Sequence, residues 1–401
     1  MSSVLLVLRS TALRAAGPAC CRWPGVPTGS TSEHNYRPAK TALLGGLTRP
    51  ASEARHQDQR QSSGVPPLIK STTDRHEWRL SGKVAGVTGD AVNADGTSGD
   101  VVAPSAGSLR FGLVGTGNWA RAAHARALAA SPDIDFVAVW GRDSAAAADL
   151  AASFGTTAHT DFDSFLVDLD AVAFAVPPDV QSKLALRAAR AGKHLLLEKP
   201  VALTTEGSNA LVTAVAEAGV ASVVFFILRF QPDASAWLTD VTSVGGWAGG
   251  HATWLESFIG SSTFNSPWRR EKGALWDLGP HVISLLRPIL GAVEGVTADV
   301  GRGDVTHLVL HHQGGATSTA TLTLGAPEAA DGFDLQVWGE RGRSSVPPLA
   351  ADRSVALRVA LGELVANARS GRTDHPCDVR FGATVTRLLA EAERAIDARR
   401  G

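Results

Sequence analysis

The sequence predicts an α/β protein with two folded domains, and three observations support this fold class. From Ser108 to Leu228, short apolar segments alternate with helical ones, which is typical of a doubly wound parallel sheet. The first strand of this region leads into a glycine-rich turn and a helix. After Arg229, several strand-like segments follow one another directly, which predicts an α+β domain with a mostly antiparallel sheet.

The first domain, residues 108–228, is divided by its periodicity and its turn residues. The expected strands are Phe111–Val114, Asp135–Trp140, Thr157–His159, Ala171–Val176, His194–Glu198 and Ala221–Leu228. The expected helices are Trp119–Ala130, Ser144–Phe154, Val180–Ala191 and Thr204–Ala218, with a helical turn at Phe162–Leu166.

The second domain, residues 229–401, has a different pattern. Strands are expected at Gly249–Phe258, Gly295–Val300, Thr306–His312, Gly315–Leu324 and Phe333–Gly339. Helices are expected at Trp276–Leu290, Ser354–Ala368 and Gly382–Arg399, on one side of the sheet.

Residues 1–107 have no sustained period and are rich in Ser, Thr, Gly, Pro and Arg. The stretch before Glu33 contains three arginines and no acidic residue, which is typical of a transit peptide. We favour another interpretation, a disordered extension or sequence upstream of the true start, because this composition does not support a core. Gly82–Gly107 is interpreted as a linker.

The composition gives no indication of a nucleic acid, a membrane or a metal ion as a partner of this protein. The net charge is −1, so nothing indicates nucleic acid or an anionic membrane as a partner. The three cysteines do not predict a disulfide framework, which fits a cytoplasmic location. No apolar run is long enough to span a bilayer. No cluster of His, Cys and carboxylates has metal-ligand spacing, so no metal is expected.

The turn after the first strand predicts the phosphate end of a dinucleotide site. It reads Gly115, Thr116, Gly117, Asn118, Trp119, Ala120, a G-x-G-x-x-A spacing. The first glycine permits the tight turn, the second permits close approach of a pyrophosphate, and the alanine permits close packing of helix and strand. Strand–glycine–helix turns also occur without a ligand, so this motif alone does not decide the function.

Two further motifs provide groups for acid–base chemistry. Glu198-Lys199-Pro200 ends a predicted parallel strand, where ligands of doubly wound sheets bind. Lys199 can hydrogen-bond a substrate hydroxyl, while Glu198 can pair with Lys199 or contact a cofactor ribose; a solvated turn is the alternative. Asp277 and His281 are four residues apart, so they share a helix face if one helix includes both. The alternative is a helix cap and a core histidine.

The end of the second strand indicates which dinucleotide is preferred. Gly141 stands where an NAD-selective site usually has a carboxylate for the ribose 2′-hydroxyl, and Arg142 follows it. An arginine can bind a 2′-phosphate through its forked guanidinium, which favours NADP over NAD. A solvated arginine in a turn is the alternative.

Five motifs together resemble the Gfo/Idh/MocA oxidoreductases, over about residues 108–401: residues 115–120, Ala-Val-Pro-Pro at 175–178, Glu-Lys-Pro at 198–200, Ser-Pro-Trp-Arg at 266–269 and Asp-x-Gly-x-His at 277–281. The resemblance implies a Rossmann domain followed by a domain with a large open sheet, through which a homo-oligomer forms. It implies that Lys199 is the catalytic lysine and His281 the acid/base, with Asp277 as its partner or as a hydroxyl ligand. It also implies that Pro177 lies against the cofactor.

Three positions depart from the family pattern. His124 lies one residue later than the usual histidine of the first helix, and Gln181 replaces a histidine that many members have after the Pro-Pro turn. Both are interpreted as peripheral to the chemistry. Ser284 stands where many members have a second aspartate, which leaves the substrate class open.

The sequence therefore predicts an NADP-dependent oxidoreductase, with NAD as a possible cofactor, that acts on a sugar, polyol or related hydroxy compound. Arg229, Arg269 and Arg270 are further candidates for binding an anionic substrate group, and the tryptophans of the second domain are interpreted as core. The rival hypothesis is a regulator or sensor that binds a dinucleotide without turnover. The combination of Lys199, Asp277 and His281 favours the enzyme.

Overall fold

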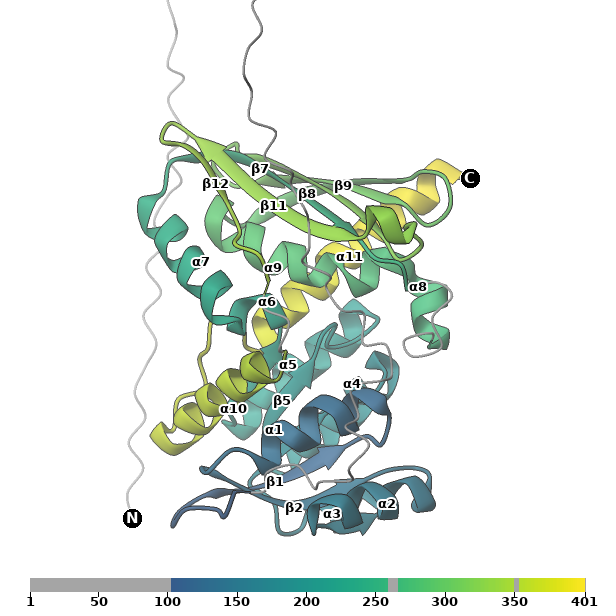
Figure 1. Ribbon diagram of the computed structural model, residues 1–401, viewed down its shortest axis with the longest axis vertical. Coiled ribbons are helices and arrows are strands. Elements are labelled where there is room, and N and C mark those ends of the chain that lie inside the picture. The colour runs from purple at the N-terminus through teal and green to yellow at the C-terminus, as the bar shows by residue number, and fades with distance from the viewer. Residues whose placement is uncertain (1–101, 259–265, 350–352, 401) are drawn as a thin grey trace, which may run out of the picture. The chain divides into compact units, whose positions relative to one another are not determined.

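The computed structural model describes residues 102–258, 266–349 and 353–400 (Figure 1). The expectations for residues 1–101 lie outside this described part. None of the described helices is long and apolar enough to cross a membrane. No group of three or more potential metal ligands is found among the described residues.

Sheet A is the doubly wound sheet that the alternation predicts. Its six strands lie in the order β3-β2-β1-β4-β5-β6 and are all parallel. They are β1 (Leu109–Val114), β2 (Ile134–Trp140), β3 (Thr157–His159), β4 (Ala171–Phe174), β5 (His194–Glu198) and β6 (Ser222–Phe225). The strand order reverses between β1 and β4, so the ligand-binding crevice is expected beyond the carboxyl ends of these two strands.

The helices of this region begin and end where side chains satisfy the free backbone groups. Asp143 accepts hydrogen bonds from the N–H groups of Ala145 and Ala146 and so caps α2 (Ser144–Phe154). Thr204 caps α5 (Thr205–Ala218) in the same way, and Pro178 occupies the first turn of α4 (Pro178–Arg190). The short α3 spans Phe162–Leu166.

The helix after the glycine turn differs from the expected α-helix. Ala120–Ala125 form a π-helix (η1), which continues as the four-residue α1 (Arg126–Ala129). A π-turn contains more residues than an α-turn and often marks a functional site. Its consequence for His124 is described with the site below.

Sheet B contains six strands in the order β12-β11-β7-β10-β9-β8, and every pairing is antiparallel except that of β7 with β10. The strands are β7 (Trp247–Leu255), β8 (Val293–Val300), β9 (Thr306–His312), β10 (Thr317–Thr323), β11 (Gly332–Gly339) and β12 (Gly342–Ser345). Leu308 and Leu310 are buried, whereas His307 and His311 on either side of them are exposed. The mostly antiparallel sheet is confirmed, and Figure 1 shows α9 and α11 along one of its faces.

The helices that follow sheet A differ from the expectations in three places. The strand β6 ends at Phe225, and two unpredicted helices follow it, α6 (Ile227–Phe230) and α7 (Pro232–Val244). The single helix expected at Trp276–Leu290 is two helices, α8 (Pro267–Asp277) and α9 (Gly279–Leu290). A short 3₁₀ turn, η2, covers Glu328–Ala330.

The last two helices connect the two sheets. α10 (Arg353–Ser370) packs beside α1 and against β5 and β6, so it belongs spatially to the first sheet although it follows the second in sequence. α11 (Val379–Arg400) contacts both α5 and β8. The boundary expected at residue 229 therefore does not separate two independent cores.

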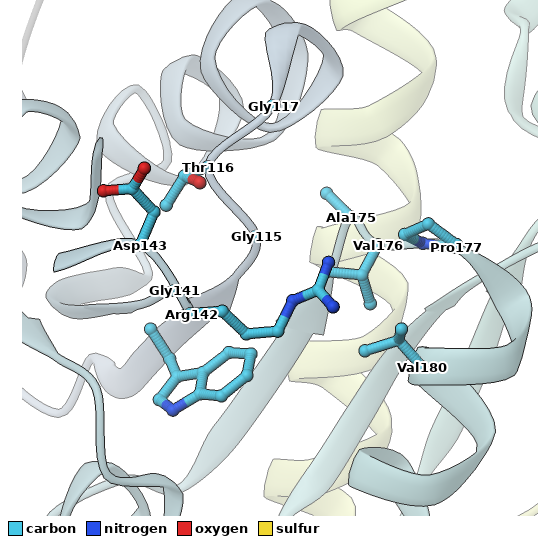
Figure 2. A pocket seen from close by; sticks show the side chains of 11 residues that line it. Gly115, Thr116, Gly117, Gly141, Arg142, Asp143, Ala175, Val176, Pro177 and Val180 are labelled. Carbon is cyan, nitrogen blue, oxygen red and sulfur yellow. The ribbon is translucent and has the colours of Figure 1, made fainter. Parts of the chain in front are cut away.

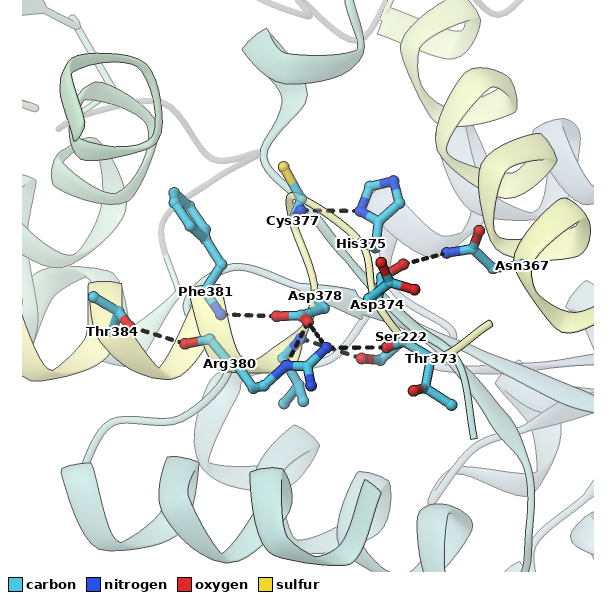
Figure 3. Close-up of polar contacts among 11 residues, drawn as sticks. Ser222, Asn367, Thr373, Asp374, His375, Cys377, Asp378, Arg380, Phe381 and Thr384 are labelled. Atoms are coloured by element: carbon cyan, nitrogen blue, oxygen red, sulfur yellow. Dashed lines mark hydrogen bonds and ion pairs between the residues drawn. The ribbon is translucent and has the colours of Figure 1, made fainter. Parts of the chain in front are cut away.

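The connection between α10 and α11 covers the edge of sheet A, as Figure 3 shows. The carbonyl of Cys377 accepts a hydrogen bond from the Val224 N–H (2.7 Å), and the Ser222 hydroxyl accepts one from the Val379 N–H (3.1 Å). A covered edge does not offer its strand for pairing with another chain. Cys377 is free and buried, and burial raises the pKa of its thiol to about 12, so it stays protonated at neutral pH.

Candidate active site

The glycine turn has the geometry that its spacing predicts. Gly115 has φ 127°, and a Cβ atom there would lie 2.5 Å from the Ala175 carbonyl oxygen, so only glycine fits. Gly117 has open space where its Cβ would stand, which leaves room for a ligand to approach the backbone. Ala120 is fully buried against the core.

A cavity of about 550 Å³ lies beside this turn, at the carboxyl ends of β1, β2 and β4 (Figure 2). Six of the predicted cofactor-binding residues line it: Gly115, Thr116, Gly117, Gly141, Arg142 and Pro177. Asn118, Trp119, Ala120 and Glu198 are not among its lining residues, whereas Trp140, Asp143, Ala175, Val176 and Val180 are. Its size, its position and the open face of Gly117 fit a dinucleotide.

Position 141, at the end of β2, is a glycine and so has no carboxylate that could bind a ribose hydroxyl. A Cβ atom on Gly141 would lie 2.6 Å from Thr116 Cγ2, so an aspartate there would require a shift of that side chain. The carboxylate of Asp143 caps α2 through its Oδ1. The Arg142 side chain is exposed and extends across the pocket toward Val176, as Figure 2 shows.

Glu198 joins the end of β5 to the first helix. Its Oε1 accepts hydrogen bonds from Trp119 Nε1 (2.6 Å) and lies 2.9 Å from His124 Nε2. Among the described residues it forms no ion pair with Lys199, which was one of the two expectations for this carboxylate. Glu198 therefore fixes the strand end to η1.

Lys199 instead contacts the second half of the chain. Its Nζ donates to Asp277 Oδ1 (2.8 Å) and to the Asp277 carbonyl oxygen (2.7 Å). The other carboxylate oxygen, Oδ2, accepts a bond from Arg269 Nε at 2.9 Å. The two cations hold the pKa of Asp277 well below its usual value, although its burial acts in the opposite direction. Asp277 is therefore an ionised carboxylate between two cations.

His281 lies in the first turn of α9, with its ring centroid 5.4 Å from that of Trp254. Its side chain is buried, and burial holds its pKa well below 6.5, with the Lys199 charge acting in the same direction. Nδ1 is closed off from solvent without a hydrogen-bond partner, so Nε2 is the ring nitrogen that can still contact another group. His281 is thus a neutral imidazole at neutral pH.

The expected pairing of Asp277 with His281 is not what the structure shows. Asp277 ends α8 and His281 begins the separate helix α9, so the four-residue spacing does not place them on one helix face. The hydrogen bonds that Asp277 accepts come from Lys199 and Arg269. Asp277 affects His281 through its charge, which raises the pKa of the imidazole and so opposes the effect of burial.

Comparison with known proteins identifies the family. Residues 109–226 match the model of an oxidoreductase family with an NAD-binding Rossmann fold, and residues 247–345 match that of a GFO/IDH/MocA C-terminal domain. The chain belongs to the Gfo/Idh/MocA oxidoreductase family. This confirms the resemblance, and the chain is therefore an oxidoreductase that binds a nicotinamide dinucleotide.

The chain is similar to two curated relatives and to two solved structures. It is 32% identical over 211 residues to levoglucosan dehydrogenase of Pseudarthrobacter phenanthrenivorans, covering 48% of this chain and 53% of that protein, about half its length. It is 27% identical over 271 residues to inositol 2-dehydrogenase of Rhizobium meliloti, covering 64% of this chain and 80% of that protein. Levoglucosan dehydrogenase in complex with NADH and L-sorbose has a TM-score of 0.64 at 19% identity, covering 73% of this chain and 97% of that one. GenD2 from gentamicin A biosynthesis, in complex with NAD, has a TM-score of 0.64 at 22% identity, covering 74% and 97%. These two structural likenesses show the fold.

The departures from the Gfo/Idh/MocA pattern have structural explanations. The π-helix at Ala120–Ala125 accommodates one more residue than an α-turn, and His124 still reaches Glu198. Ser284 donates to the His281 carbonyl oxygen at 2.6 Å, a bond within the first turns of α9. It is buried and therefore supports the helix.

Gln181, interpreted from the sequence as peripheral, is fully buried and contacts the backbone on both sides of Lys199. Its Oε1 accepts from the Glu198 N–H (2.8 Å), and its Nε2 donates to the carbonyl oxygens of Glu198 (2.7 Å) and Pro200 (3.3 Å). It therefore fixes the backbone from which the lysine projects.

For two arginines the structure shows other contacts than the sequence predicted, and one buried carboxyl group was not predicted at all. Arg269 was a candidate for an anionic substrate and instead contacts Asp277; Arg229 donates to the Ser284 carbonyl oxygen and packs over Phe381. Glu256, a buried carboxyl beside Trp254, was not singled out. A single acidic residue at the end of an apolar strand was the only available signal for it.

Proposed function

We propose that this protein is an NADP-dependent oxidoreductase that transfers a hydride between nicotinamide and a carbinol carbon of a sugar, polyol or related hydroxy compound. The contact of Lys199 with Asp277 carries the proposal. It brings the catalytic groups of the second half of the chain to the carboxyl edge of the dinucleotide-binding sheet. Asp277 ends α8 just before α9, the helix that carries His281, so the contact holds Lys199 near the start of that helix.

The site contains the two groups that alcohol oxidation requires. A bound nicotinamide dinucleotide supplies the hydride acceptor, and the protein must remove the hydroxyl proton. His281 is neutral because of its lowered pKa, so its Nε2 can accept that proton. In the reverse direction the protonated imidazole returns the proton to the alkoxide.

Lys199 provides electrostatic stabilisation of the reacting oxygen. Two hydrogen bonds to Asp277 fix its ammonium group and leave one N–H for the substrate. An ammonium held in place before the reaction stabilises the alkoxide as it forms and requires little reorganisation. The role of Asp277 is to hold Lys199, which differs from the orientation of His281 that the resemblance implied.

The preference for NADP is supported by the end of β2. Gly141 has no carboxylate, the Asp143 carboxylate caps α2, and Arg142 extends over the pocket. A guanidinium at this place matches a 2′-phosphate better than a 2′-hydroxyl. The substrate class is supported by the relatives, whose names specify levoglucosan and inositol as substrates.

We also propose that copies of the chain associate through the outer face of sheet B. This face carries a groove of about 470 Å³ lined by residues of β7, β11 and β12, among them His251, Trp338 and Arg343. Trp338 is 38% exposed and lines this groove, so a second copy bound there would cover its indole ring.

The test is single-turnover hydride transfer, followed by nicotinamide absorbance with saturating NADP⁺ or NADPH and a panel of polyols and carbonyl compounds. Lys199→Ala and His281→Ala should each slow transfer by about 10²–10⁴-fold, the usual contribution of a positioned acid–base group. Lys193→Ala is the matched control, because Lys193 lies at the opposite end of β5 and donates to the Leu169 carbonyl oxygen. Cofactor affinity should change little in all three variants. Tight NADPH binding without turnover of any compound would favour the sensor hypothesis.

A further inference from the structure

Glu256 is a buried carboxyl group that the proposed reaction does not use. It directly follows β7, and its side chain and backbone are only 6% exposed. Its N–H donates to the Thr323 carbonyl oxygen (2.9 Å), and its own carbonyl oxygen accepts from the Ala326 N–H (3.0 Å). Both backbone groups are thus fixed, and the position of the carboxyl group is well defined.

The carboxyl group is one aromatic ring away from the catalytic histidine. Its Oε1 accepts a hydrogen bond from Trp254 Nε1 at 2.8 Å. The same indole ring packs against His281, at 5.4 Å between ring centroids, and against Phe333 at 4.5 Å. Trp254 therefore sets the separation between the carboxyl group of Glu256 and the imidazole.

The second carboxyl oxygen, Oε2, has no hydrogen bond or ion pair within the described part of the chain. It is also not among the buried polar atoms that are closed off without a partner. Oε2 is therefore not completely closed off from its surroundings. A carboxyl group buried in this way is unfavourable for stability unless a further group satisfies it.

Among the described residues, no neighbouring cation forms an ion pair with the Glu256 carboxyl group. Burial raises its pKa, and the charges of Asp331 and Asp277 act in the same direction. Arg353 acts in the opposite direction, without a contact at ion-pair distance in the described chain. In either protonation state a carboxyl group hydrogen-bonds a hydroxyl, as an acceptor when ionised and as a donor when protonated.

We propose that Oε2 of Glu256 binds a second hydroxyl of the substrate, on a carbon next to the one that His281 and Lys199 act on. The enzyme then selects compounds that carry hydroxyls on neighbouring carbons, such as cyclitols and sugar rings, over simple alcohols and monodeoxy compounds. This inference rests on the proposed function, because it names the substrate class of the same site. A role limited to holding the Trp254 indole is the alternative.

The experiment compares kcat/KM for three polyhydroxy compounds with that for their monodeoxy analogues. The probes are myo-inositol, levoglucosan and glucose, each paired with analogues that lack a hydroxyl next to the oxidised carbon. In the wild-type enzyme the loss of that hydroxyl should lower kcat/KM by about ten- to a hundredfold, the usual effect of a hydrogen bond to a charged group. In Glu256→Leu this ratio should fall to near one, with NADPH affinity unchanged.

Two further variants separate recognition from packing. Glu256→Gln keeps an acceptor for Trp254 and a polar group for the hydroxyl, so it should retain part of the discrimination. Ser257→Ala is the matched control: the neighbouring side chain bonds Asp331 (2.8 Å), and its loss should leave the ratio at the wild-type value. A role limited to packing would lower kcat/KM for each compound and its deoxy analogue equally in Glu256→Leu, and that result would overturn the inference alone. If the wild-type enzyme oxidises none of the three compounds, the inference and the proposed function both fail.

Discussion

Asp277→Asn is the substitution that tests the centre of the site most directly. The Asp277 side chain is 4% exposed and its two partners, Lys199 and Arg269, are 11% and 27% exposed. An amide of the same shape accepts from one cation and turns an N–H toward the other, which leaves a mostly buried charge unpaired. Removal of one partner from a buried ion pair typically costs about 3–5 kcal/mol.

This loss should lower the melting temperature by roughly 6–10 °C, at about 2 °C per kcal/mol for a protein of this size. The folded-state pKa of Asp277 lies below its ordinary value of 3.8, so its contribution to stability is fully present above pH 3.8 and is lost as the pH falls through the folded pKa. The comparison is therefore made at pH 7, by calorimetry and urea unfolding.

Asp149→Asn is the control, because it makes the same change in an ion pair with Arg121 whose side chains are 72% and 41% exposed. That variant should lose less than about 1 kcal/mol. The double variant Lys199→Met/Asp277→Asn should be less destabilised than the sum of its single variants, because no unpaired lysine remains. Equal shifts for Asp277→Asn and Asp149→Asn would refute the argument that a buried charge pair joins the two halves of the site.

Three other predictions follow from the same structure. Removal of residues 1–101 should leave cooperative unfolding and cofactor binding intact, since their composition does not support a core; a loss of cooperativity by calorimetry would contradict this. Arg142→Ala should weaken NADPH binding by about ten- to a hundredfold and leave NADH binding unchanged, as measured by titration calorimetry; equal wild-type affinities for the two would refute the assignment. Because the folded-state pKa of His281 lies below 6.5, the unfolded chain gains a proton there first as the pH falls. Between pH 7 and pH 5 the wild-type protein should therefore lose more free energy of unfolding than His281→Asn, as measured by urea unfolding. For the same reason, kcat/KM for oxidation should stay high to below pH 6.5.

The sequence alone determined the features that depend on neighbouring residues. Alternating strands and helices predicted sheet A, because burial of both faces of a parallel sheet requires a regular local pattern. The spacing of Gly115 and Gly117 predicted the turn, because a positive φ and a close approach are properties of single positions. Gly141 and Arg142 were placed at the cavity for the same reason: they are the first two residues after β2, a strand whose end was recognisable.

The tertiary structure decided which of these groups meet. Lys199 and Asp277 are 78 residues apart, and Glu198 and His124 are 74 apart, so no local period links them. Helical spacing suggested that Asp277 pairs with His281, but the helix break at Leu278 removed that geometry and the cations took the carboxylate instead. Gln181 and Glu256 each look like an isolated polar residue in the sequence. Their burial, and the backbone or aromatic ring that each one contacts, exist only once distant segments of the chain pack together.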